Sequence, residues 1–219
     1  MLGIDLNPER IIIYIVTFLV AITVHEFMHA WTAAQLGDQT ARNLGRVSFN
    51  PAVHFDPIGF FLFLLIALGF PAIAWGKPVP VNTYNLRPLG RFGKKGSMAL
   101  IALAGPVSNV VLAAIAAIPL RLGSTALLAD PVITNFLFIF VSLNLLLAAF
   151  NMIPIPPLDG SKILMGLLPN FWTPVLAPLE RYGFMVLLLI ILIGGLGREL
   201  LNGMIAPVYD LLQTVVLPF

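Results

Sequence analysis

Cysteine is absent from this 219-residue sequence, and charged residues make up only 10% of it. Without cysteine, neither a disulfide nor a thiolate metal site can form. A soluble domain carries about 25% charged residues, whereas this chain is 59% hydrophobic with a mean hydropathy of +0.97. An integral membrane protein is therefore expected. The net charge of only +2 offers no basic patch for nucleic acid, so no nucleic-acid partner is expected.

Long polar stretches and internal repeats are also missing. No segment outside the apolar runs approaches the ~100 residues of a soluble module, so residues 1–219 are predicted to form a single integral membrane domain. The start of the chain, with Asp5, Glu9 and Arg10 before the first apolar run, lacks the pattern of a cleaved signal peptide. The first apolar run is therefore expected to be retained.

The apolar runs predict an all-α polytopic membrane protein with about five to six transmembrane helices, because a helical span needs about 20 apolar residues. Clear spans are expected at about 10–36, 97–120 and 131–152, where prolines 154, 156 and 157 end the third. Residues 57–76 either span or form a re-entrant segment, and further helices are expected in 181–219. Residues 46–50 alternate between polar and apolar, which predicts a short membrane-associated strand or β-hairpin element.

Basic residues give the expected sidedness. The segment 77–95 is the most basic part of the chain, and the positive-inside rule places it in the cytoplasm. The helix from Ser97 then runs outward and the helix from Pro131 returns, which leaves Asp159 near the cytoplasmic side. Arg42 and Arg46 favour a cytoplasmic 38–56 loop, which requires 57–76 to be re-entrant; the alternative places this loop outside.

The most informative motif is His25-Glu26-Phe27-Met28-His29, in which Glu26 is the only charged residue between Ile11 and Gly37. On a helix the two histidines lie one turn apart on one face, so both imidazoles can reach one metal ion. Glu26 is placed to take a proton from a metal-bound water. A charge inside a membrane helix is costly and indicates function. The motif therefore predicts a metal site.

A catalytic zinc site needs a third protein ligand. Asp159 is one candidate, because it follows a proline-broken helix end that can direct a side chain toward the bundle. His54 is the other, since imidazole is an equally good ligand and Asp56 is placed to orient it. The remaining acids lie at segment ends, where they are expected to face water: Asp5, Glu9, Asp38, Asp56, Asp130, Glu180, Glu199 and Asp210.

Three blocks of the sequence, in order, resemble the signature blocks of the site-2 protease family of intramembrane zinc metalloproteases. They are His25–His29, Ala104-Gly-Pro-Val-Ser-Asn109, and Asn151-Met-Ile-Pro-Ile-Pro-Pro-Leu-Asp159-Gly160. Residues 42–51 and 76–82 resemble the compact subgroup that lacks an accessory PDZ or CBS domain. The resemblance covers about residues 20–165, and it implies a catalytic core at about 10–165 with C-terminal helices at about 181–219.

The resemblance implies a zinc metalloendopeptidase of the HExxH type with one zinc per chain. His25, His29 and Asp159 would hold the zinc, and Glu26 would act as general base toward zinc-activated water. Asn151 would contact the substrate or the oxyanion. Asn109 is a second such candidate, although it would also serve to repair a helix kinked at Gly105-Pro106. His54 remains the alternative metal ligand.

The expected partners are the lipid bilayer and transmembrane proteins or peptides as substrates, cleaved within or near their membrane segments. The expected location is the cell membrane, as a multi-pass protein with its active site nearer the cytoplasmic side. A metal-ion transporter would need polar residues at several depths and usually a repeat, and a catalytically silent relative would not need Glu26. The sequence indicates neither the substrate's identity, nor the trigger for cleavage, nor the oligomeric state.

Overall fold

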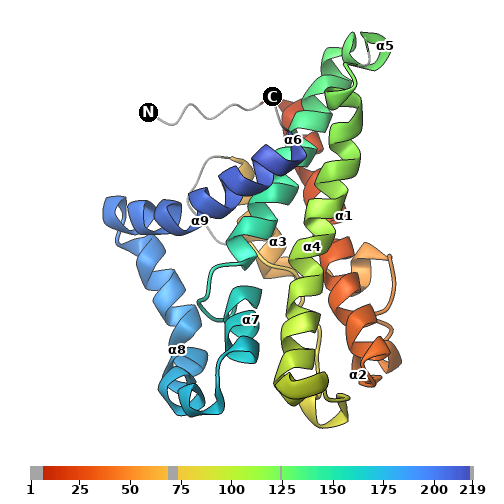
Figure 1. The fold of residues 1–219 in the computed structure, drawn as a ribbon. Helices are drawn as coiled ribbons and strands as arrows, with labels where there is room; N and C mark the ends of the chain where they lie inside the picture. The colour runs from red at the N-terminus through yellow and green to blue at the C-terminus, as the bar shows by residue number, and fades with distance from the viewer. Residues whose placement is uncertain (1–6, 69–73, 124, 218–219) are drawn as a thin grey trace.

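The computed structural model of the chain describes residues 7–68, 74–123 and 125–217, and their regular structure is entirely helical (Figure 1). Three long helices dominate, α1 (Pro8–Gln35), α4 (Gly93–Arg121) and α6 (Pro131–Asn151). The other α-helices are α2 (Thr40–Asn43), α3 (Pro57–Ala67), α5 (Thr125–Leu128), α7 (Asp159–Leu167), α8 (Thr173–Leu192) and α9 (Gly195–Val216). Short 3-10 turns are η1 (Pro51–Val53), η2 (Thr83–Asn85), η3 (Gly90–Phe92) and η4 (Asn170–Trp172).

Three helices begin with the same local signal, a polar cap followed by proline. Asn7, Asp56 and Asp130 cap α1, α3 and α6, and the next residue in each case is proline. Each cap accepts a hydrogen bond from a backbone N–H in the first turn, where no carbonyl of the helix is available. Proline fits the first helical position because its missing N–H would be unpaired there. Asp56 is thus a helix cap, and its expected role beside His54 is not needed to explain it.

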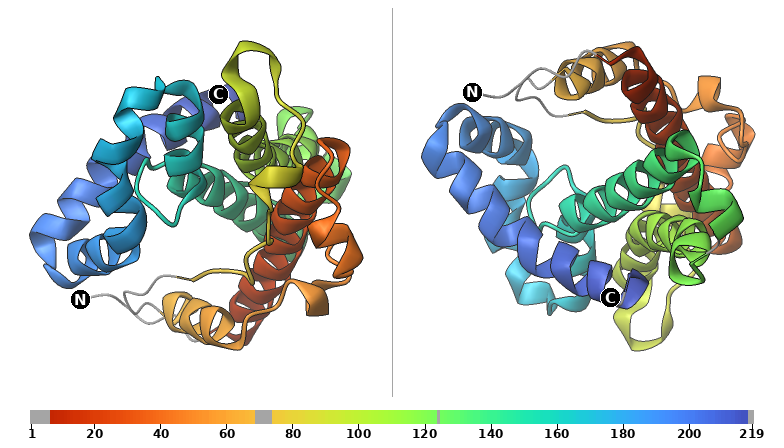
Figure 2. Two further views of the ribbon diagram at one scale, coloured as in Figure 1. Left: turned by 90° about the horizontal axis from the view of Figure 1, so that it is seen from below. Right: turned by 90° about the horizontal axis from the view of Figure 1, so that it is seen from above.

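Helix α4 is the centre of the molecule and packs against α1, α6 and α7. Figures 1 and 2 show α1, α4 and α6 side by side, with α7 against the first half of α4 and α9 crossing α6. Buried Ala113 and Ala117 of α4 face Val141 and Leu145 of α6, and Val216 of α9 joins this cluster. Small residues let membrane helices approach closely. This close packing fixes the three long helices relative to one another.

Three helices are long and apolar enough to cross a membrane, namely Pro8–Gln35, Gly90–Arg121 and Pro131–Asn151. Residues Arg181–Ile190 and Gly195–Val216 would add a fourth span only together, and they are bent by 116°. The prediction of five to six spans is therefore wrong for the described residues. It counted apolar runs without the bends inside them. Helix α3 has 11 residues, about 16 Å at 1.5 Å per residue, which is too short to cross. Residues 69–73 lie outside the described residues, so re-entry of 57–76 stays a prediction.

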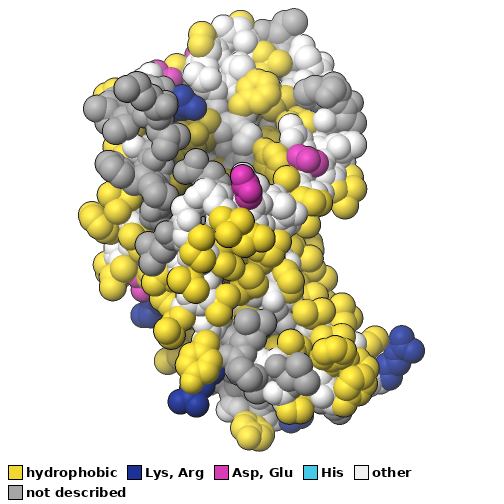
Figure 3. Space-filling model, turned by 90° about the vertical axis from the view of Figure 1, so that its left-hand side faces the viewer, with side chains coloured by type: hydrophobic (Ala, Val, Ile, Leu, Met, Phe, Trp, Pro, Cys, Tyr) yellow, Lys and Arg dark blue, Asp and Glu magenta, His cyan; other side chains and the backbone are white. Residues whose placement is uncertain are grey.

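Large hydrophobic side chains are exposed along the long helices. Ile12 of α1 is 60% exposed, Ile115 of α4 is 59% exposed, and Phe138 of α6 is also exposed. Figure 3 shows hydrophobic side chains over much of one face of the molecule. In water such a continuous apolar surface would drive association. The surface suits lipid, as the composition predicts.

The predicted strand or β-hairpin element at 46–50 is wrong, since the described residues contain no strand. A side-chain contact, not a strand ladder, holds this loop. Arg46 is buried and donates from Nη2 to the carbonyl of Lys77, so the loop is anchored by a side chain. The facing segment contains Pro78 and Pro80, which lack the N–H groups that a ladder needs.

Asp38 was expected to face water, but it is fully buried just beyond the end of α1. Its carboxylate accepts hydrogen bonds from the backbone and hydroxyl of Thr40, from the N–H of Asn82 and from the side chain of Asn85. The N–H of Arg87 also donates to the carbonyl of Leu36. These bonds hold the end of α1 beside the segment that leads into α4.

Candidate metal centre

Helix α1 carries two of the candidate ligands on one face. His25 and His29 are 3% and 7% exposed, and their rings meet edge to face at 4.6 Å between centroids. Their Nε2 atoms lie 3.0 Å apart. The i, i+4 spacing in the sequence therefore produces the shared face that the motif predicts.

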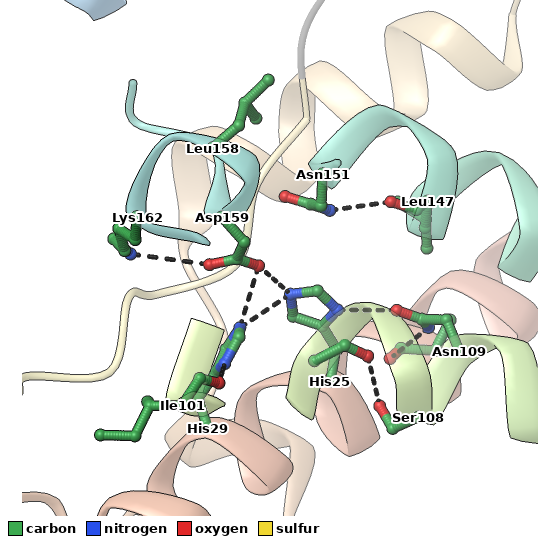
Figure 4. A network of polar contacts seen from close by, with 12 residues as sticks. His25, His29, Ile101, Ser108, Asn109, Leu147, Asn151, Leu158, Asp159 and Lys162 are labelled. Carbon is green, nitrogen blue, oxygen red and sulfur yellow. Dashed lines mark hydrogen bonds and ion pairs between the residues drawn. The ribbon is translucent and has the colours of Figure 1, made fainter. Parts of the chain in front are cut away.

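Asp159 supplies the third group from the first residue of α7. Its Oδ2 lies 3.2 Å from Nε2 of His25 and 3.1 Å from Nε2 of His29 (Figure 4). The prolines at 154, 156 and 157 lie in the turn after α6, and α7 begins directly after that turn. Among the described residues, His25, His29 and Asp159 are the one group of three side chains close enough to hold a metal ion.

The protons of the two imidazoles can be placed from their other contacts. Nδ1 of His29 lies 2.7 Å from the carbonyl oxygen of Ile101, which can only accept, so this nitrogen carries the proton. Nδ1 of His25 lies 2.7 Å from Oδ1 of Asn109 and donates to it. In the neutral rings both Nε2 atoms are then unprotonated and carry a lone pair. Ligating histidines commonly donate their other N–H in this way.

Two lone pairs and a carboxylate oxygen thus converge with no proton between them. Burial alone would raise the pKa of Asp159, but charge and hydrogen bonding from His29 and His25 in their protonated forms lower it well below its ordinary range, and a bound cation would take the place of those protons. Neutral imidazole and ionised carboxylate are the forms that bind metal. Two histidines and one carboxylate form a known catalytic zinc set. The donor set therefore fits zinc.

The approach of α4 to these imidazoles requires glycine at position 105. A β-carbon there would lie 2.5 Å from Nε2 of His29 and 2.7 Å from Cε1 of His25. Such distances are far below van der Waals contact, so any side chain would displace both rings. Pro106 follows within the helix. The Ala104–Asn109 block thus shapes the metal centre from α4, through the close approach of Gly105 and the contact of Asn109 with His25.

A cavity of about 280 Å³ opens onto the three groups. Glu26, Asn151 and Lys162 line it, together with residues of the irregular segment 74–81 and Phe184 of α8. The ring of Phe184 meets Trp75 edge to face at 6.0 Å. A larger cavity of about 660 Å³ lies between the start of α1, α6 and α9, and its described lining residues include no cluster of three His, Asp or Glu side chains. The candidate metal-binding cluster therefore lies at the smaller cavity.

The predicted polar residues differ in where they point. Glu26 is buried and lines the cavity, where its charge acts on His29. Asn151 lines it too, although its Nδ2 donates to the carbonyl of Leu147. Asn109 does not line the cavity and points to His25 instead. Geometry thus favours substrate contact for Asn151 and a supporting role for Asn109.

His54, the alternative ligand, lies outside the cluster. It is buried, and its Nε2 lies 2.8 Å from the carbonyl oxygen of Ser48 and donates to it. Burial lowers the pKa of this imidazole, which favours the neutral ring. His54 therefore stabilises the loop before α3 through its hydrogen bond to Ser48.

Three contributors were not found from the sequence. Lys162 lies one turn after Asp159, with Nζ 3.6 Å from Oδ1. Gly105 was noted only as a kink. Asn144 is fully buried in α6 and contacts Asn109. The sequence does indicate a role for Asn144, because a side-chain amide in an otherwise apolar span needs a hydrogen-bond partner.

Comparison with known proteins adds independent support. The profile of Peptidase family M50 matches residues 119–194, which include Asn151 and Asp159. "Putative zinc metalloprotease YwhC" of Bacillus subtilis (strain 168) is 39% identical over 183 residues, covering 80% of this chain and 78% of the relative. "Putative zinc metalloprotease Rip2" of Mycobacterium tuberculosis (strain ATCC 25618 / H37Rv) is 32% identical over 187 residues, covering 83% and 67%.

The protein of the same name from Mycolicibacterium smegmatis is 28% identical over 195 residues, covering 85% of this chain and 69% of the relative. No solved structure matches the chain. The identity and coverage shared with YwhC are high enough to assign the family. The chain therefore belongs to peptidase family M50, the site-2 proteases, which are zinc-dependent metalloproteases of membranes.

Proposed function

We propose that this chain is an intramembrane metalloendopeptidase of the HExxH type that hydrolyses peptide bonds within or near transmembrane segments of other proteins. His25, His29 and Asp159 hold one zinc ion, and Glu26 is the general base. The observation that carries the proposal is the convergence of two imidazole lone pairs and one carboxylate oxygen within 3.2 Å of one another, beside a cavity lined by Glu26.

Bound zinc would polarise the scissile carbonyl and acidify a water molecule. The carboxylate of Glu26, which lines the same cavity, takes the proton of the attacking water and returns it to the leaving amine. The amide of Asn151 lies on the same cavity and is available to the developing oxyanion. Lys162 adds positive charge beside Asp159. These side chains divide proton transfer and charge stabilisation between them.

The cavity limits the form of the substrate. At about 280 Å³ it cannot hold a whole helix, which is about 10–12 Å wide with its side chains. A helix also hides its carbonyl groups in its own hydrogen bonds. The substrate segment is therefore bound locally unwound, against residues 74–81. Membrane segments rich in residues of low helix propensity are the expected substrates.

Charge distribution supports a cytoplasmic position for the site. His25 and His29 lie within three turns of the end of α1, which contacts the segment leading into α4 through Leu36 and Arg87. Basic residues gather at this end of the molecule: Arg42, Arg46, Lys77, Arg87, Arg91, Lys94, Lys95 and Lys162. At the other end, α1 starts beside Arg10 and α4 ends at Arg121. Excess basic charge marks the cytoplasmic side.

The test compares E26Q with wild type in lipid vesicles, with a set of fluorogenic single-span peptides as substrate. Zinc bound per chain and zinc transported into the vesicle lumen are measured in parallel. Wild type should hold about one zinc per chain, cleave the peptides and transport no zinc into the vesicle lumen. E26Q should keep about one zinc per chain and cleave at least about 100-fold more slowly, as expected for loss of a general base. Transport of zinc into the lumen without peptide cleavage would instead indicate a transporter. Equal cleavage rates for E26Q and wild type would exclude the general-base role of Glu26.

A further inference from the structure

Two buried asparagines connect the three long helices to His25. Asn109 of α4 and Asn144 of α6 are both fully buried. Nδ2 of Asn109 donates to Oδ1 of Asn144 at 2.9 Å, and Nδ2 of Asn144 donates to the carbonyl of Phe140 at 2.9 Å. Oδ1 of Asn109 meets Nδ1 of His25 at 2.7 Å (Figure 4). The chain of contacts thus runs from a backbone carbonyl of α6 to a candidate metal ligand of α1.

The direction of every bond in this chain is fixed by its first member. The carbonyl of Phe140 can only accept, so the amide nitrogen of Asn144 must face it. Oδ1 of Asn144 is then the atom that faces Asn109, and it can only accept. Nδ2 of Asn109 must therefore face Asn144, which leaves Oδ1 of Asn109 for His25. The carbonyl of Ala21, at 3.3 Å from the same Nδ2, favours the same orientation.

The two histidines differ in how their protons are placed. Nδ1 of His29 faces the backbone carbonyl of Ile101, whose orientation is fixed by helix α4. Nδ1 of His25 faces a side-chain amide, which presents either an acceptor or a donor depending on its orientation. With the amide reversed, Nδ2 of Asn109 would face Nδ1 of His25. The proton would then move to Nε2 and remove a lone pair from the cluster.

We propose that Asn144 is a positioning residue of the metal centre. It fixes the amide orientation of Asn109, and through it the tautomer of His25 that presents a lone pair to the metal. The inference rests on the proposed role of His25 as a zinc ligand. It also explains the buried amide itself, because an apolar residue of similar volume would avoid the desolvation of an amide inside the bundle.

This role and a packing role make opposite predictions for two substitutions of similar size. Asn144→Leu removes the acceptor for Asn109 but suits an apolar helix interface. Asn144→Asp keeps an acceptor toward Asn109 in either protonation state but is poorly suited to burial. If Asn144 orients Asn109, Leu weakens zinc binding and Asp preserves it. If Asn144 only packs, Leu is tolerated and Asp is the harmful change.

The experiment measures the zinc dissociation constant of the full chain in detergent by competition with a chelator, beside the thermal unfolding midpoint. We expect Asn144→Leu to weaken zinc binding about 10- to 100-fold, as for loss of other outer-shell partners, without lowering the unfolding midpoint. Asn144→Asp should stay within about threefold of wild type. Asn135→Leu is the matched control, because Asn135 is an exposed asparagine near the start of the same helix. Its zinc affinity should not change.

A double substitution tests the path through Asn109. Asn109→Leu alone should weaken zinc binding, and adding Asn144→Leu should weaken it little further, since residues in one hydrogen-bonded network are not additive. Wild-type affinity in Asn144→Leu, or fully additive effects in the double variant, would overturn the proposal. Unchanged zinc binding in His25→Ala would contradict the ligand set itself, so failure of the proposed function is recognised separately.

Discussion

The Nε2 atoms of His25 and His29 lie 3.0 Å apart, and in the neutral rings neither atom carries a proton. Two nitrogen lone pairs repel at this distance, and Oδ2 of Asp159 adds negative charge beside them. Only a cation or an added proton makes this arrangement favourable. The metal centre can therefore be tested by zinc content as well as by catalysis.

Removal of Asp159 should abolish stoichiometric zinc binding. Wild type purified in detergent without chelator should contain about one zinc per chain, and Asp159→Ala should contain much less, because two histidines alone leave a catalytic set incomplete. Elemental analysis measures this directly. His54→Ala is the matched control, since His54 donates to Ser48 outside the cluster. Zinc lost from the control but kept by Asp159→Ala would move the third ligand to the loop.

A methyl group at position 105 should disrupt the metal centre from α4. Its β-carbon would lie 2.5 Å from the ring of His29, so the imidazoles must leave the positions from which they face Asp159. Gly105→Ala should lose most bound zinc and cost about 1–3 kcal/mol of stability through overpacking.

Gly203→Ala in α9 is the control for Gly105→Ala, because a β-carbon there meets nothing within 4 Å. Alanine in an open helical position should leave zinc content unchanged and raise stability by up to about 1 kcal/mol. Full zinc occupancy in Gly105→Ala would show that α4 yields more easily than the geometry indicates.

The sequence predicted the long spans and the ligand face because both depend on local periodicity. Helices α1, α4 and α6 are continuous apolar runs, and the spacing of His25 and His29 is read from one helix. The number of spans was wrong because hydropathy alone does not show a bend such as the 116° angle between the C-terminal helices. The strand was wrong because Arg46 anchors its loop by a tertiary contact.

The parts of the site missed by sequence reasoning all involve contacts between helices. Asn144 is 35 residues from Asn109 along the chain, and only the packing of α6 on α4 joins them. Asp38 reads as a charge at a helix end, yet 44 residues separate it from its partner Asn82. Gly105 reads as a kink until the imidazoles of α1 are placed against it. Such roles follow from three-dimensional proximity rather than spacing.

Lys162 should contribute to zinc affinity only weakly. Its Nζ lies 3.6 Å from Oδ1 of Asp159, which leaves Oδ2 toward the histidines, but the lysine side chain is 42% exposed. Partly exposed ion pairs contribute about 0–1 kcal/mol, so Lys162→Met should weaken zinc binding about fivefold at most. Chelator competition measures the change. Lys162→Arg keeps the charge and should match wild type, whereas a loss as large as that of Asp159→Ala would make Lys162 essential to the centre.

The buried carboxylate of Asp38 should make stability depend on pH at the acid end. Burial would raise its pKa, but hydrogen bonds from Thr40, Asn82 and Asn85 outweigh this and lower the pKa below its ordinary value of 3.8. A lowered folded-state pKa adds stability that is fully present above the ordinary value and is lost as pH falls through the folded-state value. Asp38 therefore stabilises the protein at neutral pH and progressively less below about pH 4.

Asp38→Asn should lower stability at neutral pH by about 1–3 kcal/mol, because its amide group cannot accept from every donor that Asp38 satisfies. Thermal unfolding of both proteins from pH 7 to pH 3 should show the gap narrow as the pH falls, since wild type loses its advantage when Asp38 is protonated. Asp210→Asn, at an exposed aspartate of α9, should follow wild type throughout. A gap that stays constant to pH 3 would mean that shape rather than charge accounts for the contribution of Asp38.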